Sequence, residues 1–226
     1  MATIAENLQA VRARIGRAAQ AARRDRASVT LLAVSKTHPA SRIAEALGAG
    51  QQAFGENYVQ EAFEKMTALP RLEWHLIGPL QSNKTRLVAE RFQWVHTLDR
   101  EKIARRLSEQ RPAHLPALNA LIQVNASGEK TKSGVPLAEA EALAAQVAVL
   151  PRLRLRGLMA IPEPGAERAR YRAVREAYEA LQRKFDLDTL SMGMSDDLEV
   201  AIAEGATMVR IGTAIFGQRR EEKSAA

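Results

Sequence analysis

The chain of 226 residues contains no cysteine. Disulfide bonds, thiolate catalysis and thiolate metal sites are therefore excluded, and a cytoplasmic location is expected. No apolar run approaches the length of a membrane span, and the N-terminal segment MATIAENLQAVRARIG has an amphipathic helical pattern rather than a signal-peptide pattern. We therefore expect neither a membrane partner nor a secretory signal.

Aromatic residues are scarce, at 4%, and this scarcity affects how the net charge of +7 is interpreted. The arginines are scattered over helical segments and interleaved with glutamate, and no stripe combines aromatic with basic residues. Nucleic-acid binding is consequently the least favoured function class, and no nucleic-acid partner is expected. The positive charge would instead help to attract an anionic ligand.

No GxGxxG or P-loop sequence follows the first predicted strand, which argues against an open nucleotide-binding sheet. Short β-rich runs alternate with segments of helical periodicity along the whole chain. The predicted strands are 30–36, 53–57, 72–78, 94–98, 119–125, 155–161, 189–194 and 208–213. The predicted helices are 4–23, 40–49, 58–68, 83–91, 100–109, 136–149, 166–184 and 196–204. This order predicts a single α/β domain, a (β/α)8 TIM-type barrel with an extra N-terminal helix, and a frayed tail over 218–226.

Lys36 closes the first predicted strand, in LLAVSKTHP, and is the most informative polar residue of the sequence. In a barrel, residues at the C-terminal strand ends face the active-site mouth. Strand alternation places Leu32, Val34 and Lys36 on one side, so an apolar floor would lie beneath the amine. A lysine there usually reaches solvent or forms an ion pair. The alternative is a Schiff-base lysine, because burial lowers the pKa of the amine and frees its lone pair for an aldehyde.

Two later segments contain features that suit a phosphate group. In SMGMSDDLEVAIAEGA, Ser195 is predicted where a helix begins, although it could equally cap that helix. Asp196 and Asp197 are expected to face solvent, because they would repel a phosphate. In MVRIGTAIFG, Gly212 and Thr213 follow the eighth strand, and barrels commonly bind phosphate after strands seven and eight.

Arg210 lies inside this same apolar strand, on the side shared with Met208 and Gly212. An arginine cannot shed its charge, so it needs an acceptor or an aromatic ring. A buried structural ion pair is the alternative to a ligand contact. His75 is as compatible with a satisfied core position as with a ligand contact. The other histidines show no metal-binding spacing, and we expect no metal.

Six segments of this chain resemble the pyridoxal phosphate homeostasis protein family. They are LLAVSKTHP, FGENYVQE, EWHLIGPLQSNK, RGLMAI, SMGMSDDLEVAIAEG and VRIGTAIFG. The resemblance covers about residues 4 to 217. It implies one barrel spanning residues 1–226, similar to the N-terminal domain of alanine racemase (the fold type III of enzymes that use pyridoxal 5′-phosphate, PLP) but without its second β domain.

The resemblance also implies PLP as the cofactor, held by Lys36 as an aldimine. Ser195 and the amides of Gly212 and Thr213 would hold the phosphate, and Arg210 would face the pyridine nitrogen. The ring pocket would be lined by Asn57, Met159, Ser191 and Met192. No role follows for Lys132 in the loop 125–134.

The family is described as controlling PLP supply, with effects on amino-acid and keto-acid balance and without a known turnover. The resemblance therefore implies a cytoplasmic, monomeric PLP carrier or regulator with no catalytic residues, whose partners would be PLP and PLP-dependent apoenzymes. A PLP-dependent amino-acid racemase or lyase is the first alternative. A cofactor-free Schiff-base aldolase acting on a sugar phosphate is the second.

Overall fold

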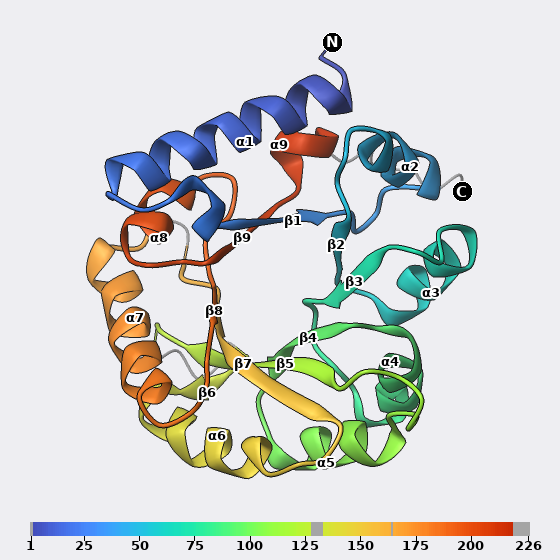
Figure 1. Cartoon of the computed structure of the whole chain (residues 1–226), viewed down its shortest axis with the longest axis vertical. Coiled ribbons are helices and arrows are strands. Elements are labelled where there is room, and N and C mark those ends of the chain that lie inside the picture. Colours follow the sequence, from blue (N-terminus) through green and yellow to red (C-terminus); the bar gives the residue numbers. More distant parts are fainter. Residues whose placement is uncertain (1, 128–132, 164, 219–226) are drawn as a thin grey trace, which may run out of the picture.

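The computed structural model describes residues 2–127, 133–163 and 165–218, and these residues form a closed parallel β-barrel surrounded by helices (Figure 1). The barrel strands follow one another in chain order, each hydrogen-bonded to the next, and pairing of β4 with β5 and of β1 with β9 closes the ring. The strands are β1 (Thr30–Val34), β2 (Ala53–Glu56), β3 (Glu73–Leu76), β4 (Trp94–Leu98), β5 (Leu118–Asn125), β7 (Leu153–Ala160), β8 (Thr189–Ser191) and β9 (Met208–Ile211). The predicted barrel is confirmed.

Each predicted helix is present among the described residues. They are α1 (Ile4–Ala21), α2 (Ala40–Gly48), α3 (Val59–Ala68), α4 (Thr85–Arg91), α5 (Glu101–Gln110), α6 (Ala140–Ala148), α7 (Arg168–Gln182) and α8 (Leu198–Ala203). Five shorter elements have two to four residues each; two of them fall in the predicted helices 83–91 and 136–149, and the other three were not predicted. They are β6 (Val135–Pro136), α9 (Thr213–Phe216) and the 3-10 helices Arg26–Ser28, Ser82–Lys84 and Leu137–Glu139. The predicted tail lies outside the described residues from position 219 onward.

Several strands end earlier than predicted, at the C-terminal mouth of the barrel. β1 ends at Val34 rather than at residue 36, and β8 ends at Ser191 rather than at residue 194. The chain turns there through conformations that a strand does not allow, with φ of 66° at Thr37 and 97° at Gly193. The residues predicted at strand ends therefore lie in turns that follow the strands.

The core has two layers, as the alternation of side chains along each strand requires. One layer packs between the strands and the helices. The other fills the barrel interior with two apolar clusters: Leu32, Val34, Ile77 and Met208 in the first, and Trp94, Leu121 and Met159 in the second. The prediction that Leu32 and Val34 share an inward side is confirmed.

Helix α1 lies across the outside of the barrel next to α8 and α9 (Figure 1). It begins with a capping box, in which Thr3 and Glu6 satisfy each other's backbone N–H groups. Its Arg14 forms an ion pair with Glu199 of α8 and donates a 2.6 Å hydrogen bond to the carbonyl oxygen of Ser195. The extra N-terminal helix therefore helps to fix one predicted site residue. No helix among the described residues combines the length and the apolar character that crossing a membrane requires.

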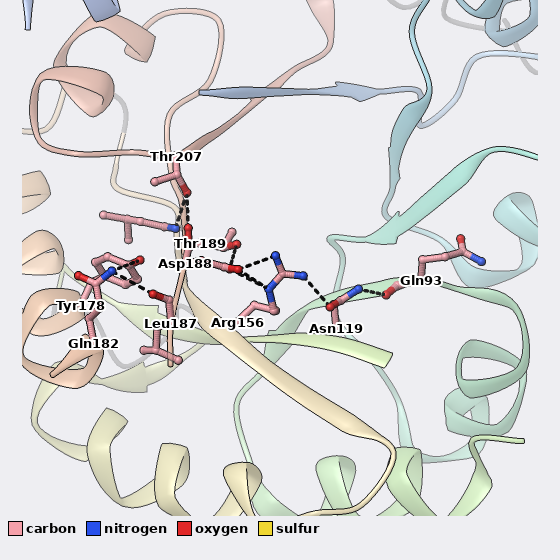
Figure 2. Close-up of polar contacts among 10 residues, drawn as sticks. Gln93, Asn119, Arg156, Tyr178, Gln182, Leu187, Asp188, Thr189 and Thr207 are labelled. Atoms are coloured by element: carbon pink, nitrogen blue, oxygen red, sulfur yellow. Dashed lines mark hydrogen bonds and ion pairs between the residues drawn. The ribbon is translucent and has the colours of Figure 1, made fainter. Parts of the chain in front are cut away.

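Polar side chains close the N-terminal end of the barrel, as Figure 2 shows around Arg156. The Arg156 guanidinium donates to Asp188 at 2.7 Å and to the Asn119 side chain at 2.8 Å. It also lies 4.6 Å from the ring centroid of Trp94, inside the barrel. Paired polar groups thus lie across this end of the barrel, whereas barrels place their ligand sites at the C-terminal end.

Candidate functional site

Lys36 lies in a tight turn directly after β1, and its side chain is half-buried. The turn begins at Ser35, whose N–H donates to the Gly55 carbonyl at 3.0 Å and whose carbonyl accepts from the His38 N–H at 3.1 Å. The next residue, Thr37, has a φ of 66°, a left-handed conformation that is costly for a β-branched residue. Such a turn persists only where neighbouring contacts hold it.

A buried cluster of charges supplies those contacts. The Lys65 ammonium on α3 donates to the Ser35 carbonyl at 2.8 Å, to Glu56 at 2.7 Å and to Glu61 at 2.6 Å. Ser35 Oγ donates to the same Glu56 oxygen at 2.6 Å, and the Thr37 N–H donates to Glu61 at 2.5 Å. The residues on both sides of Lys36 are therefore held by one cluster.

Burial makes this cluster sensitive to the loss of any member. Lys65 is 6% exposed and Glu56 is fully buried. Burial raises the pKa of Glu56, while the Lys65 ammonium and the Ser35 hydroxyl act in the opposite direction. The Glu56 carboxylate has one oxygen, Oε2, with no partner among the described residues. Removing the ammonium would leave a buried carboxylate with little compensation.

We predict that Lys65→Met lowers the free energy of unfolding by about 3–5 kcal/mol, because it leaves Glu56 buried without its cation. Lys65→Met combined with Glu56→Leu should recover part of that loss, since both charges are then removed. Urea unfolding monitored by circular dichroism measures both effects. Lys102→Met, at an exposed position on α5, is the matched control. Equal stability losses in the single and double variants would contradict a buried ion pair.

Arg210 lies on β9 inside the barrel and is 4% exposed. Its Nη1 donates to both the carbonyl and the hydroxyl of Ser191 at 2.9 Å, and its Nη2 donates to the Ala160 carbonyl at 2.9 Å. Burial lowers its pKa to about 10, so the guanidinium remains charged at neutral pH. Among the described residues no carboxylate forms a salt bridge with it, and the predicted alternative of a buried ion pair is not found. Three of its five N–H donors are engaged, which leaves two for a ligand.

Two buried histidines continue the contacts of Ser191 into the barrel. His96 Nδ1 lies 3.2 Å from Ser191 Oγ, and His96 Nε2 lies 2.9 Å from His75 Nδ1. His75 Nε2 lies 2.8 Å from a carboxylate oxygen of Glu73. Burial lowers the pKa of both rings, most strongly that of His96, which also lies near the Arg210 charge. Both imidazoles are therefore neutral at neutral pH.

This burial predicts that stability depends on pH. Because the histidine pKa values are lower in the folded protein than the unfolded value near 6.5, the unfolded chain binds more protons as the pH falls. The contribution is complete above about pH 6.5 and is lost below it, at up to about 1.4 kcal/mol per pH unit for each histidine.

Urea unfolding between about pH 8 and pH 5 measures this slope. His96→Gln should lower the free energy of unfolding. It should also reduce the slope of that free energy against pH by the equivalent of about one bound proton. His114→Gln, the same replacement at an exposed position, is the matched control. An identical slope in His96→Gln and wild type would contradict the prediction.

The three residues predicted to hold a phosphate come from neighbouring strand ends. Gly212 and Thr213 follow β9, where Gly212 precedes α9 and Thr213 begins it. A Cβ on Gly212 would lie 3.2 Å from the Val34 carbonyl, so glycine allows the chain to pass close to β1 here. Ser195 lies in a turn, and α8 begins only at Leu198 after Asp197 as its N-cap. The alternative in which Ser195 caps the helix is therefore wrong.

Asp197 does not face solvent as expected. Its carboxylate accepts a 2.6 Å hydrogen bond from the Tyr171 hydroxyl and another from the Met194 N–H. Burial, together with the hydrogen bond to Asp197, raises the pKa of Tyr171. Asp196 is exposed, as expected. The acid closest to the Ser195 turn is thus occupied by contacts within the protein.

The residues predicted for the ring pocket are only partly brought together. Met159 lies inside the barrel with Trp94 and Leu121. Asn57 follows β2, and its buried Oδ1 has no partner among the described residues. Met192 packs instead in the layer between strands and helices, because it follows the inward-facing Ser191 and points the opposite way.

Two hollows in the described part of the chain bear on where the site lies. One of about 260 Å³ lies at the mouth, beside the ends of β5 and β7, and is lined by Gln123, Asn125 and Glu163 among others. A larger one, of about 550 Å³, lies between α1 and the start of β1 and contains Arg12 and Arg26 but none of the predicted site residues. We assign the site to the mouth, because Lys36 follows β1 and Arg210 lies on β9, the strand paired with β1.

The sequence did not reveal two sets of contacts that support the site, those of Lys65 with Ser35 and those between His75 and His96. Lys65 lies on a helix whose periodicity predicts only an amphipathic surface, and its contact with Ser35 joins positions 30 residues apart. His75 and His96 lie on neighbouring strands, 21 residues apart. The shared inward side of Glu73 and His75, two residues apart, is the one signal that could have indicated a buried polar chain.

Comparison with known families gives one match that covers most of the chain. The model of the alanine racemase N-terminal domain matches residues 6–220. The chain is 63% identical to the pyridoxal phosphate homeostasis protein of Pseudomonas aeruginosa, with 97% of each covered. It is 58% identical to the protein of the same name from Escherichia coli, with 99% of this chain and 100% of that one covered.

Solved structures give the same picture. PipY of Synechococcus elongatus with PLP bound is 39% identical, has a TM-score of 0.82, and is matched over 95% of this chain and 100% of that one. Alanine racemase of Corynebacterium glutamicum is 19% identical, with a TM-score of 0.73 and 97% of this chain but 61% of that one covered. At this identity the likeness to the racemase shows the fold alone.

Proposed function

The chain belongs to the pyridoxal phosphate homeostasis protein family, and from this membership we propose that it binds PLP and takes part in controlling the supply of that cofactor. The observation that carries the proposal is the lysine in a clamped turn at the barrel mouth. Lys36 follows β1, and the buried Arg210 lies on β9, the strand paired with β1. The Lys36 amine therefore extends from the end of one strand, and the Arg210 guanidinium, with N–H donors available, lies on the neighbouring strand.

The residues present fit this cofactor. Arg210 has two N–H donors that no described residue occupies, which suits an unprotonated pyridine nitrogen. Asn57 has a buried oxygen without a partner, which suits a polar substituent of the ring. Gly212 allows a close backbone approach and leaves the amides near α9 accessible to a phosphate.

Each residue then has a defined task. Lys36 Nζ attaches the cofactor covalently, Ser195 with the Gly212 and Thr213 amides holds the phosphate, and Arg210 contacts the ring nitrogen. When bound, PLP supplies an aldehyde that reacts with amines and a ring that withdraws electrons. Asn57, Met159 and Ser191 border the ring, and the Met192 side chain is not part of this set.

The proposed role is that of a carrier or regulator rather than an enzyme. The Arg210 cation disfavours a proton on the ring nitrogen, which weakens the ring as an electron sink. Tyr171 and Tyr178 are buried on α7, where Tyr171 donates to Asp197 and burial raises the pKa of Tyr178 to about 12. Neither is suited to remove a substrate proton. A racemase or lyase of unrecognised substrate is the alternative.

Three further expectations belong to this proposal. The protein is expected to act in the cytoplasm and as a monomer. PLP-dependent apoenzymes are the expected recipients of its cofactor. The absence of cysteine is compatible with a reducing compartment.

We predict that the purified protein is yellow and that borohydride reduction fixes the cofactor on Lys36. Trypsin should then fail to cleave after Lys36 and should release residues 27–42 as one modified peptide, identified by mass spectrometry. Lys36→Ala should release the same residues without the added mass, and Lys102→Met, at an exposed position on α5, should keep the modified peptide. A colourless protein that PLP does not modify would contradict the proposal and favour a cofactor-free aldolase.

We predict little exchange of the α-proton of amino acids in deuterated water, because an unprotonated ring stabilises a carbanion poorly. Arg210→Glu should raise the exchange rate by favouring the protonated ring. Nuclear magnetic resonance measures deuterium incorporation at equal cofactor occupancy, with Lys36→Ala as the background. Fast exchange over many turnovers by the wild type would replace the carrier with the enzyme alternative.

A further inference from the structure

A single chain of polar contacts crosses the barrel interior from one end to the other. It begins at Glu73, the first residue of β3, whose side chain is 49% exposed at the N-terminal end of the barrel. It continues through His75, His96 and Ser191, each buried, and ends at Arg210 below the mouth. The proposed function does not account for the three members farthest from the mouth.

The donors and acceptors of this chain allow one arrangement of protons. An ionised Glu73 only accepts, so His75 must carry its proton on Nε2 and accept on Nδ1. His96 must then donate from Nε2, which leaves its Nδ1 to accept from the Ser191 hydroxyl. Arg210 only donates, so Ser191 accepts from it. With both rings neutral, every hydrogen bond points from Arg210 toward Glu73.

The charges around the chain favour this direction. Arg210 is positive at the mouth and Glu73 is negative at the other end, so the aligned dipoles between them are stabilised at both ends. Trp94 stacks on His75 with ring centroids 5.1 Å apart, and the Arg156 guanidinium lies over the Trp94 ring. The charge of Arg156 also helps to lower the pKa of Glu73, after the hydrogen bond from His75. Asp197 acts on Arg210 from the mouth side. Glu73 is thus the only carboxylate in direct contact with the chain among the described residues.

We propose that Glu73 is a positioning residue for the cofactor site, which sets the tautomers of His75 and His96 and thereby the hydrogen bonds that orient the Arg210 guanidinium. The link from Arg210 to PLP rests on the proposed function, whereas the tautomers do not. Without an acceptor at position 73, His75 loses the contact that keeps its proton on Nε2. His96 is then no longer required to donate from Nε2 to His75, and Ser191 is no longer required to donate to His96.

The first measurement uses the protein without cofactor. Long-range proton–nitrogen spectra of protein labelled with nitrogen-15 in histidine report which ring nitrogen carries the proton. Wild type should show the Nε2–H form at both His75 and His96. Glu73→Leu should give a mixture of tautomers at both rings, and Glu73→Gln should retain the wild-type form because its amide oxygen still accepts. Glu109→Leu removes an exposed carboxylate on α5 and is the matched control.

The second measurement is the affinity for PLP, read from the absorbance of the bound cofactor. Glu73→Leu should weaken binding by about fivefold or more, the usual lower range for coupling between separate sites. Glu73→Gln and Glu109→Leu should bind as wild type does. If Glu73→Leu fails to fold, Ser191→Ala replaces it. That change interrupts the chain between His96 and Arg210, so PLP binding should weaken while both rings keep the Nε2–H form, because Glu73 still fixes them.

A proton on Nδ1 of either histidine in wild type would overturn the proposal. So would unchanged tautomers, or unchanged PLP affinity, in Glu73→Leu. A general loss of packing would lower stability in Glu73→Gln and Glu73→Leu alike, without the difference in tautomers between them. If PLP fails to bind wild type, the proposed function fails, while the tautomer spectra still decide whether the chain has this direction.

Discussion

The positive charge of Arg210 inside the barrel is the constraint on which the rest of the site depends. An arginine keeps its charge even where burial is costly, and here no carboxylate lies against it. Carbonyl oxygens and a serine hydroxyl take three of its donors instead. A second positive charge nearby would be repelled, which together with burial keeps His96 neutral. The polar side chains that adjoin Arg210 in the interior, those of Ser191 and His96, are accordingly neutral and hydrogen-bonded.

The two lysines near the mouth illustrate how surroundings assign different tasks to one residue type. Lys65 is enclosed by Glu56, Glu61 and the Ser35 carbonyl, so its amine is committed as a charged donor. Lys36 lies between two residues that this cluster holds, Ser35 and Thr37. One lysine thus fixes the backbone from which the other extends. An amine that forms and breaks a covalent bond must return to the same position, and a strained turn without such support would relax.

The barrel and much of its mouth could be predicted from the sequence because they depend on local patterns. Alternation along strands correctly placed Leu32, Val34, Met208 and Arg210 on inward sides, and every predicted strand was found. The contacts that stabilise these residues depend on register between strands and on helix orientation. Position in the sequence alone does not give them.

Three particular contacts show this limit. The sequence places Lys65 on an amphipathic helix, and only the packing of α3 brings it to Ser35. Asp197 resembles an ordinary N-cap acid until Tyr171 of another helix is seen to donate to it. Met192 was assigned to the ring pocket. Its side chain points outward because it follows the inward-facing Ser191, the last residue of β8, and it packs between the strands and the helices.

Holding PLP without turnover requires tight attachment together with a ring that remains a poor electron sink. In the proposed site, contacts near α8 and α9 would hold the phosphate, and a covalent bond to Lys36 would complete the attachment. An unprotonated ring would follow from contact with Arg210, whose guanidinium donates to oxygen acceptors and adjoins the polar chain that ends at Glu73. A carboxylate placed beside Arg210 would neutralise that charge and bring the ring nitrogen closer to protonation. Because Glu73 lies at the other end of the barrel rather than beside Arg210, the charge of Arg210 at the proposed cofactor site would remain largely intact.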